Sequence, residues 1–243
     1  MGLRGLSLLG IAAVISAGIS VVTTAQAQGP APQGTPAPAG GAVHIVTYLD
    51  LTSAGAVQAA SLLKRYRDAA RKQSANLNVD VYQEIGRIGR FAIREGWRDA
   101  RAFEDNAAAE HAKQLSAALK PLQLAPADQR RHDAYSMGNG RAVAGTAAVY
   151  VLTHVDVPPP LLAELEPQLK LWAEGSRKDA GVIAFDVLQQ ANRKNHFTVV
   201  EGWQSSKAFE AQGAAGPART FRDKLGPMLG ALYDQRLYRL VKS

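Results

Sequence analysis

Two glutamates lie in the same short motif, and each could act as a general base. The triplet Glu-Gly-Trp begins at Glu95 and again at Glu201. Each glutamate falls in a stretch of alternating apolar residues (FAIREGW and FTVVEGW), which predicts a strand with the glutamate on its helix-facing side. A carboxylate in such a place needs hydrogen-bond partners. It is either a structural group held by backbone amides or an arginine, or a general base that faces a cleft.

A histidine is the second candidate base. His111 lies eight residues after Phe103 on a predicted helix, which places it about 80° around the helix axis from that side chain. There His111 could act as a general base, or it could face solvent. Pro217 stands at the corresponding position of the second motif, close to Gly213 and Gly216. The helix is therefore predicted to be broken or to begin late there, which favours the first motif as the active one.

Further side chains are candidates for binding a substrate. Trp97 and Trp203 end the two motifs, where they could anchor a core beneath a helix or stack on a flat molecule. Tyr82 and Phe103 are the other aromatic candidates, and Asp50, at the end of a predicted strand, is either a polar pocket group or part of a helix start. The histidines lack the spacing of metal ligands and there is no cysteine, so we expect no metal site. The sequence has no G-x-G-x-x-G after a strand and no phosphate loop, and we expect no cofactor.

The two motifs belong to a tandem duplication with an offset of 106 residues. Identical residues at this offset include Thr47 and Thr153, Arg71 and Arg177, Asp80 and Asp186, and Phe103 and Phe209. The copies are predicted to span 43–137 and 148–243, joined by a linker at 138–147. Arg94, whose counterpart is Val200, is predicted on the strand face turned away from the helices. A buried arginine there would need a carboxylate partner or a bound anion.

Both copies show the same succession of elements. A β-rich stretch (HIVTYLDL or YVLTHVDV) is followed by an amphipathic helix, a hairpin, a second helix over about 99–119 or 205–225, and a last strand. The order βαββαβ is the ferredoxin-like arrangement, an α+β fold. Because such a sheet carries helices on one face only, its other face needs a cover. We expect two ferredoxin-like units packed sheet to sheet as an intrachain dimeric α+β barrel.

The Glu-Gly-Trp motif at the end of the third strand, followed by a helix with a Phe eight residues after the Glu, resembles the antibiotic biosynthesis monooxygenase (ABM) domain family. This family belongs to the dimeric α+β barrel superfamily, and the resemblance covers about 43–135 and 148–241. It implies a cofactor-independent monooxygenase acting on a small aromatic or quinol-type molecule, with His111 where many such sequences carry a histidine. Haem-degrading relatives carry a further Trp in the second helix, which neither copy has. The alternative is a non-catalytic binding or structural module.

The N-terminus has the features of an export signal. Residues 1–27 carry one basic residue, an apolar core and the small-residue pattern Ala25-Gln26-Ala27, which predicts cleavage after Ala27 and a periplasmic or secreted protein. An uncleaved membrane anchor is the alternative. A linker rich in Pro, Gly and Ala follows at 28–42. The net charge of +7 is spread along the chain without a recognition motif, so we expect no nucleic-acid partner. The sequence predicts a pseudo-dimer within one chain and leaves further assembly open.

Overall fold

The computed structural model describes residues 41–139, 144–214, 216–231 and 233–242. The predicted signal peptide at 1–27 and nearly all of the linker at 28–42 lie outside these residues. No helix within the described ranges is both long enough and apolar enough to span a membrane.

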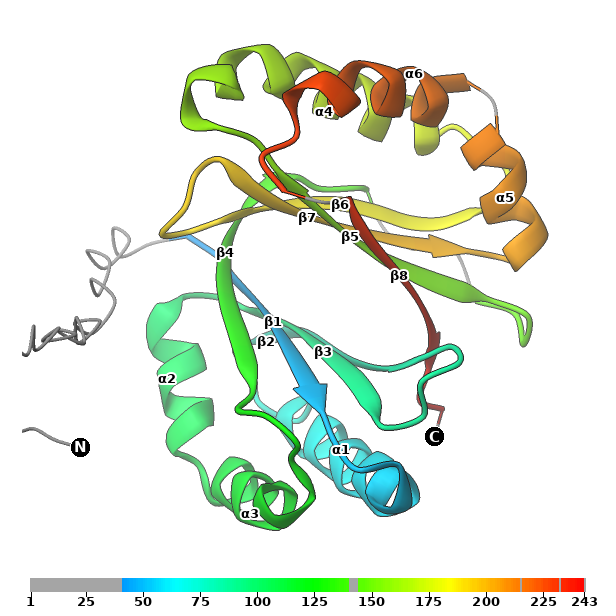
Figure 1. The fold of residues 1–243 in the computed structure, drawn as a ribbon. Helices are drawn as coiled ribbons and strands as arrows, with labels where there is room; N and C mark the ends of the chain where they lie inside the picture. Colours follow the sequence, from blue (N-terminus) through cyan, green and yellow to red (C-terminus); the bar gives the residue numbers. More distant parts are fainter. Residues whose placement is uncertain (1–40, 140–143, 215, 232, 243) are drawn as a thin grey trace, which may run out of the picture. The chain divides into compact units, whose positions relative to one another are not determined.

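Each half of the chain folds in the predicted order βαββαβ (Figure 1). The elements of the first half are β1 (Val43–Asp50), α1 (Ala56–Ala70), β2 (Asn76–Glu84), β3 (Arg90–Trp97), α2 (Ala100–Ala108), α3 (Glu110–Leu119) and β4 (Asp128–Ser136). Those of the second half are β5 (Val149–Asp156), α4 (Leu162–Ser176), β6 (Val182–Gln190), β7 (His196–Trp203), α5 (Ser206–Ala214), α6 (Gly216–Leu225) and β8 (Asp234–Leu240). Short 3-10 turns lie at Ser53–Gly55, Lys120–Leu122, Pro159–Leu161 and Gly226–Met228.

The eight strands form one closed barrel in the order β1-β3-β2-β8-β5-β7-β6-β4. The last strand of each half pairs with the second strand of the other half. Tyr82 of β2 lies opposite Leu240 of β8, and His132 of β4 lies opposite Gln190 of β6. The prediction of an intrachain barrel is therefore confirmed, and hydrogen-bonded strand edges close it in addition to packing between sheets. Closure leaves no sheet edge among these eight strands.

The helices lie outside the barrel, with α1 to α3 against the strands of the first half and α4 to α6 against those of the second (Figure 1). Trp97 and Trp203 are fully buried under these helices, as expected for core anchors. The barrel interior holds a third cluster that includes Tyr82, whose ring centroid lies 5.0 Å from that of Tyr150. Tyr82 was predicted as a substrate-binding residue, but it packs between the two halves on the face away from the helices.

The barrel interior also contains the buried arginine. Arg94 Nη2 lies 2.6 Å from Asp186 Oδ2, and both side chains are almost completely buried. The second carboxylate oxygen of Asp186 accepts a hydrogen bond from the backbone N–H of Gly138 at 2.9 Å. The expectation that Arg94 needs a carboxylate partner is thus confirmed. This ion pair joins β3 of the first half to β6 of the second.

The second helix is broken in both halves, whereas the sequence predicted a break only near Pro217. In the second half, α6 begins at Gly216, whose φ of +65° is accessible to glycine at little cost. In the first half, the break falls at Ala109, which is extended (φ −70°, ψ 152°) although no Gly or Pro lies in the segment. The prediction of a continuous helix over 99–119 was therefore wrong. Side-chain hydrogen bonds of Asn106, described below, tie the chain to its neighbours just before this break.

Candidate active site in the first half

A cavity of about 240 Å³ lies between the sheet and the helices of the first half. Strands β1 and β3 supply its floor with Thr47, Leu49, Ile93 and Glu95, and α2 and α3 supply most of its walls. The helix residues that line it are Phe103, Asn106, Ala107, Ala112, Leu115, Ser116 and Leu119. The walls are thus mainly apolar. We call this space the first-half cavity.

Glu95 is the ionisable acid in this cavity wall. Its side chain is buried, and the hydroxyl of Tyr66 donates a hydrogen bond to Glu95 Oε1 at 2.6 Å. Burial raises the pKa of Glu95, while this hydrogen bond and the nearby indole of Trp97 oppose the rise. Burial and the neighbouring carboxylate also raise the pKa of Tyr66 far above its ordinary value, so the phenol stays a donor. A carboxylate of raised pKa that lines an apolar cavity can accept a proton from a bound molecule.

A chain of hydrogen bonds connects Glu95 to side chains of the surrounding helices. Asn106 Nδ2 donates to the oxygen of Tyr66 at 2.8 Å, and Asn106 Oδ1 lies 2.8 Å from His111 Nε2. Because an amide oxygen can only accept, the hydrogen of the imidazole is assigned to Nε2. Gln73 Nε2 donates to the same amide oxygen at 2.8 Å. The four residues His111, Asn106, Tyr66 and Glu95 form what we call the Glu95 chain, in which each donates to the next.

The structure brings two of the predicted site residues into the cavity and places others nearby. Glu95 and Phe103 line it. His111 is connected to the cavity only by the hydrogen bonds of the Glu95 chain, and it is not part of the cavity wall. Trp97 is buried beside Glu95 and does not line the cavity either. Asp50 ends β1 outside the cavity, where an arginine of β3 lies 3.6 Å from its carboxylate.

The duplicated positions of the second half are filled by larger side chains. Trp172 stands where the first half has Tyr66, and Phe221 stands where it has Leu115. Their rings stack with centroids 4.4 Å apart at an interplanar angle of 16°. Tyr233 likewise replaces the small Ala127 of the cavity wall.

The predicted residues Glu201 and Trp203 lie in this packed core. Trp203 Nε1 donates to Glu201 Oε2 at 3.0 Å, and the hydroxyl of Thr153 lies 3.5 Å from the other carboxylate oxygen. Burial raises the pKa of Glu201 to about 7, and the hydrogen bond from Trp203 is the largest opposing effect. The two glutamates thus occupy equivalent strand positions, but only Glu95 faces the first-half cavity.

Sequence reasoning missed Tyr66 and Asn106 as site residues. Both occupy positions where the two copies differ within an otherwise matching frame, with Trp172 and Gln212 as their counterparts. Such differences are the signal that could have found them, because a position under the same packing demands in both halves would keep its residue type. Among the described residues, no group of three or more His, Asp or Glu side chains could hold a metal ion.

Comparison with known proteins connects this architecture to a family. Residues 148–224 match the antibiotic biosynthesis monooxygenase family. The matched residues cover most of the second half, which is thus similar to an ABM domain. The first half repeats its topology at the fixed offset of 106 residues, so the ABM domain and its duplicate together build the barrel. The half that matches the family is the one in which Trp172 and Phe221 stack on each other.

Solved structures share the arrangement of both halves. A proposed monooxygenase from Fusobacterium nucleatum superposes with a TM-score of 0.76 at 13% identity, over 84% of this chain and 94% of that one. One from Lactobacillus acidophilus gives 0.70 at 10% identity, over 83% and 95%. An anthrone oxidase-like protein gives 0.62 at 13% identity, over 83% and 92%. At these identities the likeness establishes the shared fold alone. No curated protein matches the chain by sequence.

Proposed function

We propose that the first half is the active half of a cofactor-independent monooxygenase that acts on a small quinol-type aromatic molecule. The observation that carries the proposal is a buried carboxylate, Glu95, that lines an apolar cavity of about 240 Å³. The match of the ABM domain to its family and the fold shared with the proposed monooxygenases support the reaction class.

The size of the first-half cavity favours a single substituted ring. A dry apolar cavity of roughly 150 Å³ holds benzene, and most ligand pockets range from about 300 Å³ upward. A volume of about 240 Å³ therefore suits a one-ring phenol or quinol better than a polycyclic molecule. The ring would lie against the apolar walls, and its hydroxyl would point to Glu95.

The reaction balances with dioxygen as the oxidant and the quinol as the source of all electrons. Glu95 accepts the proton of a quinol hydroxyl, which leaves an electron-rich quinolate that can react with dioxygen. One oxygen atom forms a bond to a ring carbon that loses its hydrogen, and the other leaves as water. The quinol loses four electrons and becomes a hydroxyquinone, so the overall reaction requires no other reductant. His111, the other predicted base, acts in this proposal as a positioning residue through Asn106 and Tyr66.

For the second half we propose a structural role. The stacked Trp172 and Phe221 occupy the space that corresponds to the first-half cavity, which favours a scaffold over a second active site. The alternative from the sequence, a non-catalytic module, thus applies to the ABM domain at 148–224, whereas its duplicate carries the chemistry.

Oxygen consumption with a panel of one-ring quinols tests this division. Glu95→Gln removes the proton acceptor and should lower the rate by about 100-fold or more. Leu115→Phe introduces the residue of the second half and should also abolish turnover, because it fills the cavity. Glu201→Gln is the matched control, since it makes the same change in the filled half, and it should keep most of the activity. Equal loss in both glutamine variants, or full activity in Glu95→Gln, would contradict the proposal.

We also propose that the protein is exported, on the basis of the apolar leader and the Ala25-Gln26-Ala27 pattern. The reaction would then take place outside the cytoplasm. N-terminal sequencing of the protein from a periplasmic fraction tests this proposal, with Gln28 as the expected first residue. Detection of the intact leader in the membrane fraction would instead support an uncleaved anchor.

A further inference from the structure

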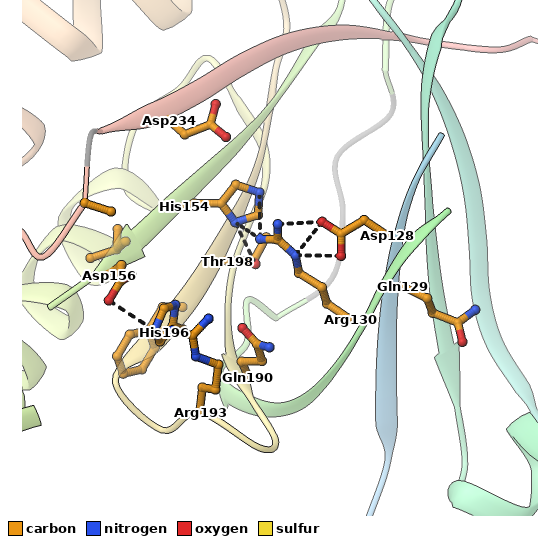
Figure 2. Close-up of a pocket in the computed structure, with 13 residues that line it drawn as sticks. Asp128, Gln129, Arg130, His154, Asp156, Gln190, Arg193, His196, Thr198 and Asp234 are labelled. Carbon is orange, nitrogen blue, oxygen red and sulfur yellow. Dashed lines mark hydrogen bonds and ion pairs between the residues drawn. The ribbon is translucent and has the colours of Figure 1, made fainter. Parts of the chain in front are cut away.

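A second cavity, of about 570 Å³, lies at one end of the barrel (Figure 2). Strands β4, β7 and β8 begin at this end, and β5 and β6 finish there. Its wall shares only Gln129 with the first-half cavity, and most of its other lining residues are polar or charged. We call it the barrel-end cavity. Nothing in the proposed monooxygenase reaction uses it.

Each acid in the wall of the barrel-end cavity already has a basic partner. Asp128 pairs with Arg130 at 2.6 Å and Asp234 with Arg236 at 2.7 Å, whereas Asp156 lies 3.1 Å from His196 Nε2, an imidazole whose pKa is lowered by burial. Arg193 differs, since its guanidinium makes no ion pair with any residue that the structure describes. In Figure 2 its side chain rises from the β6–β7 turn beside His196 and Gln190.

The corresponding turn of the first half explains why Arg193 has no carboxylate partner. Arg87 is its counterpart there, and Glu84 of that half lies 3.5 Å from Arg87 and 3.9 Å from Arg90. The second half has Gln190 at the position of Glu84, so the same arginine remains without a carboxylate. The replacement of Glu84 by Gln190 between the copies thus removes the carboxylate that this arginine contacts in the first half.

Two further differences between the copies add polar groups to the same wall. His154 and Thr198 line the barrel-end cavity, where the first half has Tyr48 and Ala92. Arg130 Nη1 lies 3.2 Å from His154 Nδ1 and 3.5 Å from His154 Nε2, so the guanidinium of Arg130 contacts this imidazole. The hydroxyl of Thr198 lies 3.3 Å from His154 Nδ1 and 3.0 Å from His132 Nε2, so the two added polar groups hydrogen-bond with neighbouring side chains.

We propose that the barrel-end cavity binds a small organic anion through a carboxylate or phosphate group, with Arg193 as its anchor. The planar guanidinium matches both groups with two parallel hydrogen bonds. The cavity volume falls within the usual range for small-molecule sites, roughly 300 to 1,000 Å³. The anion replaces the carboxylate that Glu84 provides in the first half.

Isothermal titration calorimetry with inorganic phosphate and, separately, with malonate tests the proposal. We expect saturable binding of at least one probe, and the preferred probe identifies the group that the site takes. Arg193→Ala should weaken binding by about tenfold or more, because a charge-assisted hydrogen-bond partner is lost. Gln190→Glu should weaken it to a similar extent, since it restores the internal carboxylate found in the first half.

Arg87→Ala is the matched control, because it removes the equivalent arginine from the turn of the first half and should leave binding unchanged. Circular dichroism confirms that each variant is folded, which is expected because Arg193 is exposed. The proposal is overturned if neither probe binds saturably, if Gln190→Glu binds as well as the wild type, or if Arg87→Ala weakens binding as much as Arg193→Ala does.

Discussion

The buried carboxylate of Glu201 should make the stability of the protein depend on pH in a way that one substitution removes. Burial raises its pKa from 4.5 to about 7 in the folded protein, while the unfolded chain keeps the ordinary value. Between these two values the folded state holds the proton and the unfolded state releases it. The contribution of Glu201 to stability is therefore complete below pH 4.5 and is lost as the pH rises through about 7.

The size of the effect follows from the two pKa values. Linkage between proton binding and folding gives a loss of about 2 to 3 kcal/mol in the free energy of unfolding between pH 5 and pH 8. Glu201→Gln abolishes this titration and keeps an oxygen that can accept from Trp203. The free energy of unfolding of the variant, relative to the wild type, should thus increase by about 2 to 3 kcal/mol over that interval.

Urea denaturation at several pH values, followed by tryptophan fluorescence, measures this difference. Other titrating groups cancel because both proteins contain them. Among these, burial lowers the pKa of His132 to about 3 and that of His154 to about 4, which makes stability fall towards acid pH. Glu210→Gln, which changes an exposed glutamate, is the control and should show no trend relative to the wild type. A pH-independent difference for Glu201→Gln would refute the reasoning.

Two further predictions concern the other buried polar groups. Tyr66→Phe removes the hydrogen bond that opposes the effect of burial, so the pKa of Glu95 should rise further; carboxyl ¹³C NMR measures it, and an unchanged value would argue against the contact. Arg94→Val introduces the residue found at Val200 and removes one charge-assisted hydrogen bond of Asp186, whose carboxylate keeps the backbone N–H of Gly138; the free energy of unfolding should fall by about 2 kcal/mol in urea denaturation. A loss near zero would mean that the ion pair contributes nothing.

The duplicated sequence predicted the fold well because both of its signals are local. Alternating apolar residues indicate strands, a 3.6-residue period indicates helices, and the two copies repeat these patterns in the same order. The need to cover an open sheet face then favoured the barrel. The break at Ala109 was not predicted because the segment contains no Gly or Pro. These are the two residues whose low helix propensity identifies a helix break in a sequence.

The candidate site was predictable only in part. The motif identified Glu95, and the helix spacing drew attention to His111, but neither pattern relates the histidine to the glutamate. Tyr66 and Asn106 connect them across 29 and 40 residues of sequence separation. Contacts of this kind depend on how α1, α2 and β3 pack together, which sequence periodicity does not specify.

The sequence by itself determined that this chain is two copies of a βαββαβ unit, because both the apolar periodicity and the internal repeat follow from the order of residues along the chain. The tertiary structure decided how the barrel closes, where the first-half cavity lies, and that Arg193 has no carboxylate partner among the described residues. These properties depend on the volumes and charges of side chains that meet only after folding. Trp172 and Phe221 fill one half by stacking on each other, whereas smaller side chains leave space above Glu95 in the other.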